Sequence, residues 1–182
     1  MTPAMTGQQR TISIAAGANQ GDAVASVRSA FAALARSALI SGARLSPLYR
    51  TAPVRVGAQG PDPGGDYVNA AIVAESSASP EALLALLHEI EQRGGRNRAG
   101  SPHGAPRPID LDLLTVADLT VQSAALTLPH PRMRERAFVL APLADIAPDL
   151  VVPGVGGPSL TVAELLHRLG PLDAGQVRRI EP

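Results

Sequence analysis

The sequence predicts an α+β fold, a ferredoxin-like α/β sandwich in which helices pack on a mainly antiparallel sheet. The expected elements run in the order strand, helix, strand, strand, helix, strand, which is the split βαβ pattern. The 182 residues are within the usual size of one domain, roughly 100–200 residues, and the hydrophobic fraction of 45% is enough for one packed core. We expect a flexible N-terminal tail over residues 1–10 and a single domain over residues 11–182.

A strand, a helix and a second strand are expected in the first part of the chain. Residues 11–16 are typical of a short strand. Asp22 can cap a helix that ends near Gly42, and its apolar positions have helical spacing. These positions are Val24, Val27, Phe31, Leu34 and Ala38. Residues 43–50 indicate a strand in which Pro47 requires an edge position or a bulge.

Two irregular loops flank the next strand and helix. Residues 51–65 are rich in glycine and proline, and a strand is expected over residues 67–75. Residues 79–81 start a helix, because they combine a capping serine, a first-turn proline and an acid near the positive helix end. The apolar face of this helix consists of Leu83, Leu86, Leu87 and Ile90. Residues 94–108 form the second loop.

One more strand and two further helices are expected in the last part of the chain. Residues 109–116 predict the strand, and Val121 begins another short extended segment. Residues 129–131, with two prolines, break regular structure. A helix is expected over residues 136–146, interrupted or started near its proline, and a last helix from Ser159 through Leu169.

The composition excludes several kinds of chemistry. Basic and acidic residues number 16 each, and this zero net charge argues against general binding to nucleic acid or anionic membranes. All 16 basic residues are arginine, which excludes a P-loop lysine, a Schiff-base lysine and a lysine general base. Cysteine is absent, so disulfides and thiolate sites are excluded. We find no signal-peptide core or membrane span in the sequence and expect a cytoplasmic monomer.

Asp110 and Asp112 are the strongest candidates for metal ligands. Side chains alternate along a strand, so both carboxylates point to one face, roughly 6–7 Å apart. Two carboxylates at that separation can share a pair of divalent cations, which lie about 3.5–4 Å apart in two-metal sites. Oxygen ligands of this kind suit Mg²⁺, with substrate phosphates completing the coordination shell. The pair therefore predicts magnesium bound together with a nucleotide.

Two simpler interpretations stay open at this point. A bare D-x-D pair is most often one solvated face of an edge strand. Guanidinium groups bind phosphate bidentately, and seven arginines lie close to the acidic pair in the sequence. They are Arg93, Arg96, Arg98, Arg107, Arg132, Arg134 and Arg136. Carboxylates beside such arginines suit phosphoryl transfer, but the same groups can instead pair with one another in salt bridges.

A series of short blocks makes the interpretation more specific. The blocks include IAAGAN (residues 14–19), YRTAP (49–53), DYVNAA (66–71), GRNR (95–98), RPIDLD (107–112), LPHP (128–131), RAFVLAPL (136–143) and IAP (146–148). Together, over roughly residues 11–153, they resemble the 6-hydroxymethyl-7,8-dihydropterin pyrophosphokinase family. The joint order of the blocks is much more specific than any one of them.

The resemblance implies an activity in tetrahydrofolate biosynthesis. The family transfers the β,γ-pyrophosphoryl unit of its co-substrate ATP to the hydroxymethyl oxygen of the dihydropterin and releases AMP. Asp110 and Asp112 match ligands of its two Mg²⁺ ions. Arg96 and Arg107 match loop arginines that close over the phosphates and assist the transfer. We expect Asp110 also to help lower the pKa of the attacking alcohol.

The resemblance also implies the substrate contacts. ATP contacts match Arg98, Leu113, Thr127, His130 and Arg136. The pterin pocket matches Thr51, Pro53, Val54, Tyr67, Asn69 and Phe138. From the residues alone, Asn69 has the donors and the acceptor that the edge of a pterin requires, although a strand asparagine is more often an edge or bulge residue. Core packing is the ordinary role of a lone phenylalanine such as Phe138.

Other functions remain alternatives. The family often carries a tryptophan in the loop before its second arginine and a tyrosine after the histidine of LPHP, whereas this chain has no tryptophan and Pro131 at the second position. These departures admit a weakly active or non-catalytic relative that binds pterin or nucleotide. A D-x-D glycosyltransferase would need a longer chain with a parallel sheet. A ferredoxin-like binding or regulatory module, in which acids and arginines merely pair, is the non-enzymatic alternative.

Overall fold

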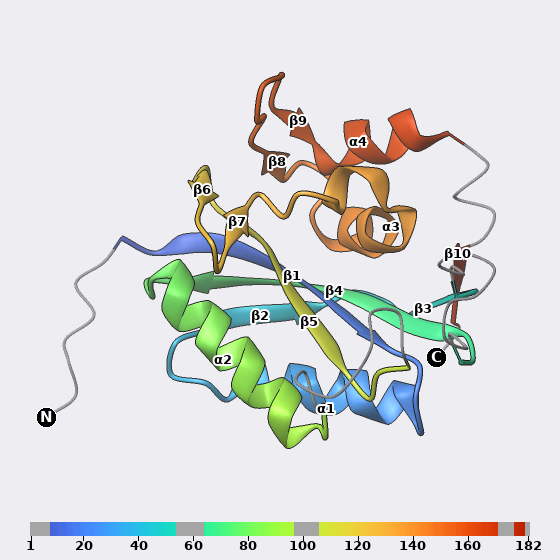
Figure 1. Cartoon of the computed structure of the whole chain (residues 1–182). Coiled ribbons are helices and arrows are strands. Elements are labelled where there is room, and N and C mark those ends of the chain that lie inside the picture. The colour runs from blue at the N-terminus through green and yellow to red at the C-terminus, as the bar shows by residue number, and fades with distance from the viewer. Residues whose placement is uncertain (1–7, 54–63, 97–105, 171–176, 181–182) are drawn as a thin grey trace, which may run out of the picture.

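One sheet lies between two layers of helices (Figure 1). The computed structural model describes residues 8–53, 64–96, 106–170 and 177–180, and within these the main sheet has six strands. The strands are β1 (Arg10–Ala18), β2 (Ser41–Leu45), β3 (Tyr49–Thr51), β4 (Tyr67–Ser76), β5 (Asp110–Val116) and β10 (Val177–Arg179). Helices α1 (Ala23–Ala35) and α2 (Pro80–Arg93) cover one face. Helices α3 (Ala137–Ile146) and α4 (Val162–Leu169) lie on the other.

The sheet topology confirms the predicted ferredoxin-like pattern. The order is β10-β3-β4-β1-β5, with β2 also paired to β4, and every neighbouring pair is antiparallel. The strand expected over residues 43–50 is divided into β2 and β3. Between them Ser46 hydrogen-bonds Ala71 twice: its backbone N–H donates to the Ala71 carbonyl, and its hydroxyl accepts from the Ala71 N–H. Pro47 therefore lies at an irregularity of the strand, where its missing N–H costs no ladder bond.

Helices α1 and α2 begin as the sequence predicts, but α1 ends earlier and α4 begins later than expected. Asp22 caps α1 by accepting from the Ala25 N–H at 3.0 Å, and Ser79 caps α2 through the Ala82 N–H. Helix α1 ends at Ala35, well before Gly42, and the hydroxyl of Ser37 there bonds the backbone locally, which competes with helix continuation. The last helix begins at Val162 and not at Ser159, because Leu160 and Thr161 form a strand.

Apolar side chains fill the space on both sides of the sheet. Under α1 and α2 the core includes Ile12, Ile14, Leu34, Leu87 and Leu111. Under α3 and α4 it includes Val73, Leu114, Met133, Leu140 and Val162. Short elements complete the second layer: β6 (Val121–Gln122), β7 (Thr127–Leu128), a 3₁₀ turn (Met133–Glu135), β8 (Val151–Val152) and β9 (Leu160–Thr161). Within the described ranges, no helix has the length and apolar character needed to cross a membrane.

Candidate functional site

Residues from four adjacent strands form a row across the sheet. In register, Tyr49 on β3 lies beside Asn69 on β4, Asn69 beside Gly17 on β1, and Gly17 beside Asp110 on β5. Strand alternation puts Asn69 on the face of Ala71 and Val73, and Asp110 on the face of Leu114, which is the face that α3 and α4 cover. We call Tyr49, Asn69, Gly17 and Asp110 the cross-strand row.

Gly17 leaves open space between the two functional side chains of the cross-strand row. A Cβ added at Gly17 would lie 3.1 Å from Oδ1 of Asn69, tighter than an ordinary contact. Gly17 also pairs with Asp110, so no side chain of β1 lies between the amide and the carboxylate at this position. The sequence block IAAGAN therefore contributes the position between the amide and the carboxylate that carries no side chain.

Asp110 is held by both predicted catalytic arginines. Nη1 of Arg96 donates to its Oδ1, and Nη1 of Arg107 donates to its Oδ2. Burial by itself would raise the pKa of Asp110, but the nearby Arg96 and Arg107 guanidinium groups outweigh it and lower that pKa below its usual value. Asp110 is therefore an ionised carboxylate near neutral pH, as a metal ligand must be.

Glu91 is a residue to which sequence analysis assigned no role. Its side chain is 1% exposed and accepts from Arg96 Nη1 and from the backbone N–H of Leu111 at 2.8 Å. Glu91 thus connects the end of α2 to the strand that carries both aspartates. A signal was present in the sequence: Glu91 follows Leu87 by four positions, which places an acid on the apolar face of the helix.

Asn19, the last residue of the block IAAGAN, anchors Arg107. Its backbone N–H donates to the Arg107 carbonyl at 3.0 Å, and its Oδ1 accepts from the Arg107 N–H at 2.8 Å. Its Nδ2 donates to the carbonyl of Gly65 at 3.3 Å. The end of β1 therefore fixes the backbone of Arg107 and joins it to the segment that precedes β4.

Asp112 lies near His130 and Arg136. Nε2 of His130 is 4.0 Å from Oδ2 of Asp112, a separation that makes an ion pair only if the imidazole is protonated. Despite the pull of Asp112, burial lowers the pKa of His130 below its usual value, which favours the neutral imidazole. The pKa of Asp112 is raised by burial and by the charge of Asp110. The guanidinium of Arg136 lies 5.5 Å from the centre of the Phe138 ring.

The predicted pterin contacts gather at the other end of the cross-strand row. Oγ1 of Thr51 accepts from Nδ2 of Asn69 at 2.8 Å, and both residues are buried. This bond fixes which way the Asn69 amide points. Tyr67 pairs with Thr51 across β3 and β4, and burial raises the pKa of its hydroxyl. Phe138 lies in the first turn of α3, above this face of the sheet.

Several predicted residues lie apart from this group. Leu113 is 3% exposed in the core under α1 and α2, so any ATP contact there would be through its backbone. Arg93 is exposed and pairs with Glu89, and Arg134 donates to carbonyls of the β8–β9 hairpin. The arginines that are close in sequence are therefore divided between the site and structural roles elsewhere. Thr127 is half-buried in β7, and Pro53 lies just beyond β3. Val54 and Arg98 lie outside the described residues.

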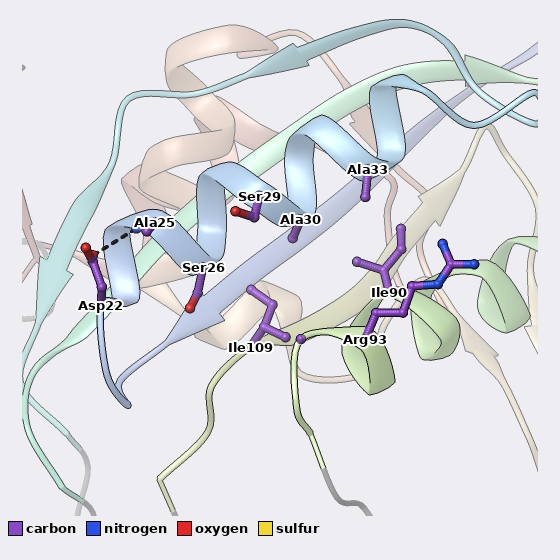
Figure 2. Close-up of a pocket in the computed structure, with 10 residues that line it drawn as sticks. Asp22, Ala25, Ser26, Ser29, Ala30, Ala33, Ile90, Arg93 and Ile109 are labelled. Carbon is purple, nitrogen blue, oxygen red and sulfur yellow. Dashed lines mark hydrogen bonds between the residues drawn. The ribbon is translucent and has the colours of Figure 1, made fainter.

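A pocket between α1 and α2 lies on the opposite side of the sheet (Figure 2). Small side chains of α1 line one wall, and Ile90, Arg93, Gly94 and Ile109 line the other. Of the arginines that lie close to the acidic pair in sequence only Arg93 lines it, and none of the predicted metal, ATP or pterin contacts does. Its connection with the site is structural: a Cβ on Gly94 would lie 2.6 Å from Cγ2 of Ile109, the residue before Asp110.

The donor set suits magnesium bound with a phosphate. Among the residues that the structure describes, no cluster of three or more His, Cys, Asp or Glu side chains is placed to hold a metal. Two carboxylates on one strand face are too few to complete a coordination shell by themselves. Mg²⁺ is commonly held by one or two carboxylates, with phosphate oxygens and water as the other ligands. Asp110 and Asp112 fit that arrangement.

Comparison with known proteins identifies relatives of this chain. The family model described as 7,8-dihydro-6-hydroxymethylpterin-pyrophosphokinase (HPPK) matches residues 13–148. The 2-amino-4-hydroxy-6-hydroxymethyldihydropteridine pyrophosphokinase of Synechocystis is 40% identical over 153 residues, covering 84% of this chain and 73% of the relative. The Bacillus subtilis protein of the same name is 38% identical over 133 residues, covering 73% and 75%.

Longer proteins also contain a similar region. A mitochondrial folate synthesis bifunctional protein of Pisum sativum is 40% identical over 139 residues, which cover 76% of this chain but 25% of that protein. The crystal structure of wild-type Plasmodium falciparum HPPK-DHPS with pterin and p-hydroxybenzoate has the same fold, with a TM-score of 0.69 at 13% identity. The match covers 96% of this chain and 46% of that one, so the chain spans about half its length. The family model and the sequence relatives together show that this chain belongs to the HPPK family.

Proposed function

We propose that this chain transfers pyrophosphate from ATP to 6-hydroxymethyl-7,8-dihydropterin, giving the pterin diphosphate and AMP in tetrahydrofolate biosynthesis. The observation that carries the proposal is the cross-strand row, in which a buried amide and an ionised carboxylate lie on one face of the sheet with only Gly17 between them. An amide that reads a pterin edge and a carboxylate that holds a metal–phosphate group are what a transfer between these two substrates requires. Family membership supports the same reaction.

The reaction requires Asp110 to exchange its partners. Both of its oxygens accept from guanidinium groups of Arg96 and Arg107. We propose that Asp110 and Asp112 would hold two Mg²⁺ ions together with ATP, and that Arg96 and Arg107 would then pair with the phosphates. The ions, when bound, neutralise charge on the transferring group. A phosphate in place of the carboxylate gives each guanidinium an anionic partner both before and after the exchange.

The residues around the aspartates and arginines bind the pterin or position the arginines. Asn69, oriented by Thr51, hydrogen-bonds the pterin edge, and Phe138 packs against its ring. Glu91 keeps Arg96 near the phosphates because it is buried and fixed by Leu111. Asn19 does the same for Arg107 by holding its backbone. Positioned donors of this kind stabilise charge that develops during transfer, typically by about 10²–10³-fold in rate per donor.

The products of one incubation test the proposal. Purified protein, ATP, Mg²⁺ and 6-hydroxymethyl-7,8-dihydropterin should give AMP and pterin diphosphate in equal amounts, and a chelator should abolish the reaction. Asp112→Asn should lose the activity, whereas Asp118→Asn, an exposed acid just beyond the same strand, should keep it. ADP as the product would contradict the proposal. No nucleotide product would instead support a non-catalytic relative or a binding module whose charges merely pair.

A further inference from the structure

The strand β10 lies beyond the region that defines the family. The family model matches residues 13–148, whereas β10 covers Val177–Arg179 near the C-terminus. It adds an outer strand to the main sheet beside β3 (Figure 1). Arg178 pairs in register with Arg50, and the N–H of Ile180 donates to the carbonyl of Leu48 at 2.7 Å. Ile180 also packs against the core under α1 and α2.

Strand β3 depends on such support because it is only three residues long. One of its edges pairs with β4 and the other with β10. Helix α3 provides a third attachment, since the hydroxyl of Tyr49 donates to Oδ2 of Asp145 at 2.7 Å. Without β10, β3 would be an edge strand with a row of unpaired backbone groups.

The position of β3 determines the pterin side of the site. Thr51, which pairs with Val177, is the residue whose hydroxyl orients the Asn69 amide. Pro53, another predicted pterin contact, lies two residues beyond the end of β3. The ATP side has different supports: Arg96 is held from α2 by Glu91, and Arg107 from the end of β1 by Asn19. A shift of β3 should therefore disturb the pterin contacts and leave the ATP contacts in place.

We infer that β10 is a positioning element for the pterin-binding side of the site, because it fixes β3 and through Thr51 orients the Asn69 amide. This inference rests on the proposed function. It assigns the C-terminal strand a part in substrate affinity, and not only in stability.

Arg178 offers a matched pair of variants. Hydrogen-bonded pairs alternate along an antiparallel ladder, so the bond between Ile180 and Leu48 places Arg178 at the next hydrogen-bonded position, with its N–H towards β3. Arg178→Pro removes that N–H, whereas Arg178→Ala keeps it. Both variants remove the same exposed charge, which faces the like charge of Arg50, so loss of the side chain should not weaken the pairing.

The test compares the KM for pterin with the KM for ATP in both variants, after circular dichroism and thermal melts confirm that they fold. We expect Arg178→Pro to raise the KM for pterin about three- to tenfold, corresponding to the loss of roughly one hydrogen bond, with the KM for ATP unchanged. Arg178→Ala should match the wild type. The inference would be overturned if Arg178→Pro and Arg178→Ala had the same KM for pterin. It would also be overturned if Arg178→Pro raised the KM for ATP as much as the KM for pterin. Failure of the wild type to release AMP would instead overturn the proposed function.

Discussion

Glu91 offers a sharp test of how the site is held together, because the same helix carries a matched exposed pair. Glu91 is 1% exposed and accepts from Arg96 and from the Leu111 N–H. Glu89 pairs with Arg93 on the same helix, but the two side chains are 54% and 73% exposed. Glu91→Gln keeps the size of the side chain and an acceptor for Leu111, and removes the charge beside Arg96.

The expected costs follow from these environments. Hydrogen bonds to charged groups contribute about 1.5–3 kcal/mol, so Glu91→Gln should lower the free energy of unfolding by an amount in that range. Glu91→Ala also leaves the Leu111 N–H buried without this acceptor, and should cost about 3–5 kcal/mol. Glu89→Gln should cost about 0.5 kcal/mol or less, as expected for an exposed helical pair.

Urea unfolding of the three variants and the wild type measures these differences, provided that the slope with denaturant is unchanged. Turnover should fall in Glu91→Gln, because Arg96 loses an anchor, and should not change in Glu89→Gln. Equal destabilisation by Glu91→Gln and Glu89→Gln would refute the structural role assigned to Glu91. Normal turnover in a folded Glu91→Gln variant would refute its role in positioning Arg96.

Three further predictions concern Gly17, the bond between Asn19 and Arg107, and the titration of His130. Gly17→Ala should fold and raise the KM for pterin in steady-state assays, since the new Cβ would lie 3.1 Å from Oδ1 of Asn69; an unchanged KM would count against the need for a glycine there. Asn19→Ala should reduce kcat more than Asn19→Asp, which still accepts from the Arg107 N–H, and equal values of kcat would argue against this anchor. Burial lowers the folded-state pKa of His130, so the unfolded chain binds more protons than the folded protein as pH falls. The contribution of His130 to stability is therefore present above pH 6.5 and is lost as pH falls through the folded-state pKa. Urea unfolding from about pH 5 to about pH 8 should show a weaker pH dependence for His130→Gln, and an identical dependence would contradict this.

Local patterns were sufficient to predict the framework of this fold. Strand alternation correctly placed Asp110 and Asp112 on one face, and capping residues correctly placed the starts of α1 and α2. These features depend on neighbours within a few residues, which a sequence displays directly. The predicted end of α1 was wrong. The apolar spacing continues towards Gly42, but the helix ends at Ala35, where the hydroxyl of Ser37 bonds the backbone locally.

The site itself depends on contacts between distant parts of the chain. The bond between Asn19 and Arg107 joins residues 88 positions apart, and no local pattern indicates it. Proximity in sequence was also misleading for the arginines: Arg134 is two residues from Arg136, yet it binds carbonyls of the β8–β9 hairpin. The register of four strands brings Gly17 between Asn69 and Asp110, and register is a property of the assembled sheet.

Calorimetry tests most directly whether Asp110 exchanges its arginine partners for metal and nucleotide. Mg²⁺ alone, a non-hydrolysable ATP analogue alone, and the two together would each be titrated into the protein. We predict that Mg²⁺ alone gives no measurable binding, because Asp110 is paired with two arginines and the described part of the chain places too few carboxylates there to complete the shell. The mixture should bind tightly, and a chelator or Asp112→Asn should abolish that binding. Tight binding of Mg²⁺ without nucleotide, or equally tight binding of the analogue with and without metal, would contradict the proposed exchange of partners at Asp110.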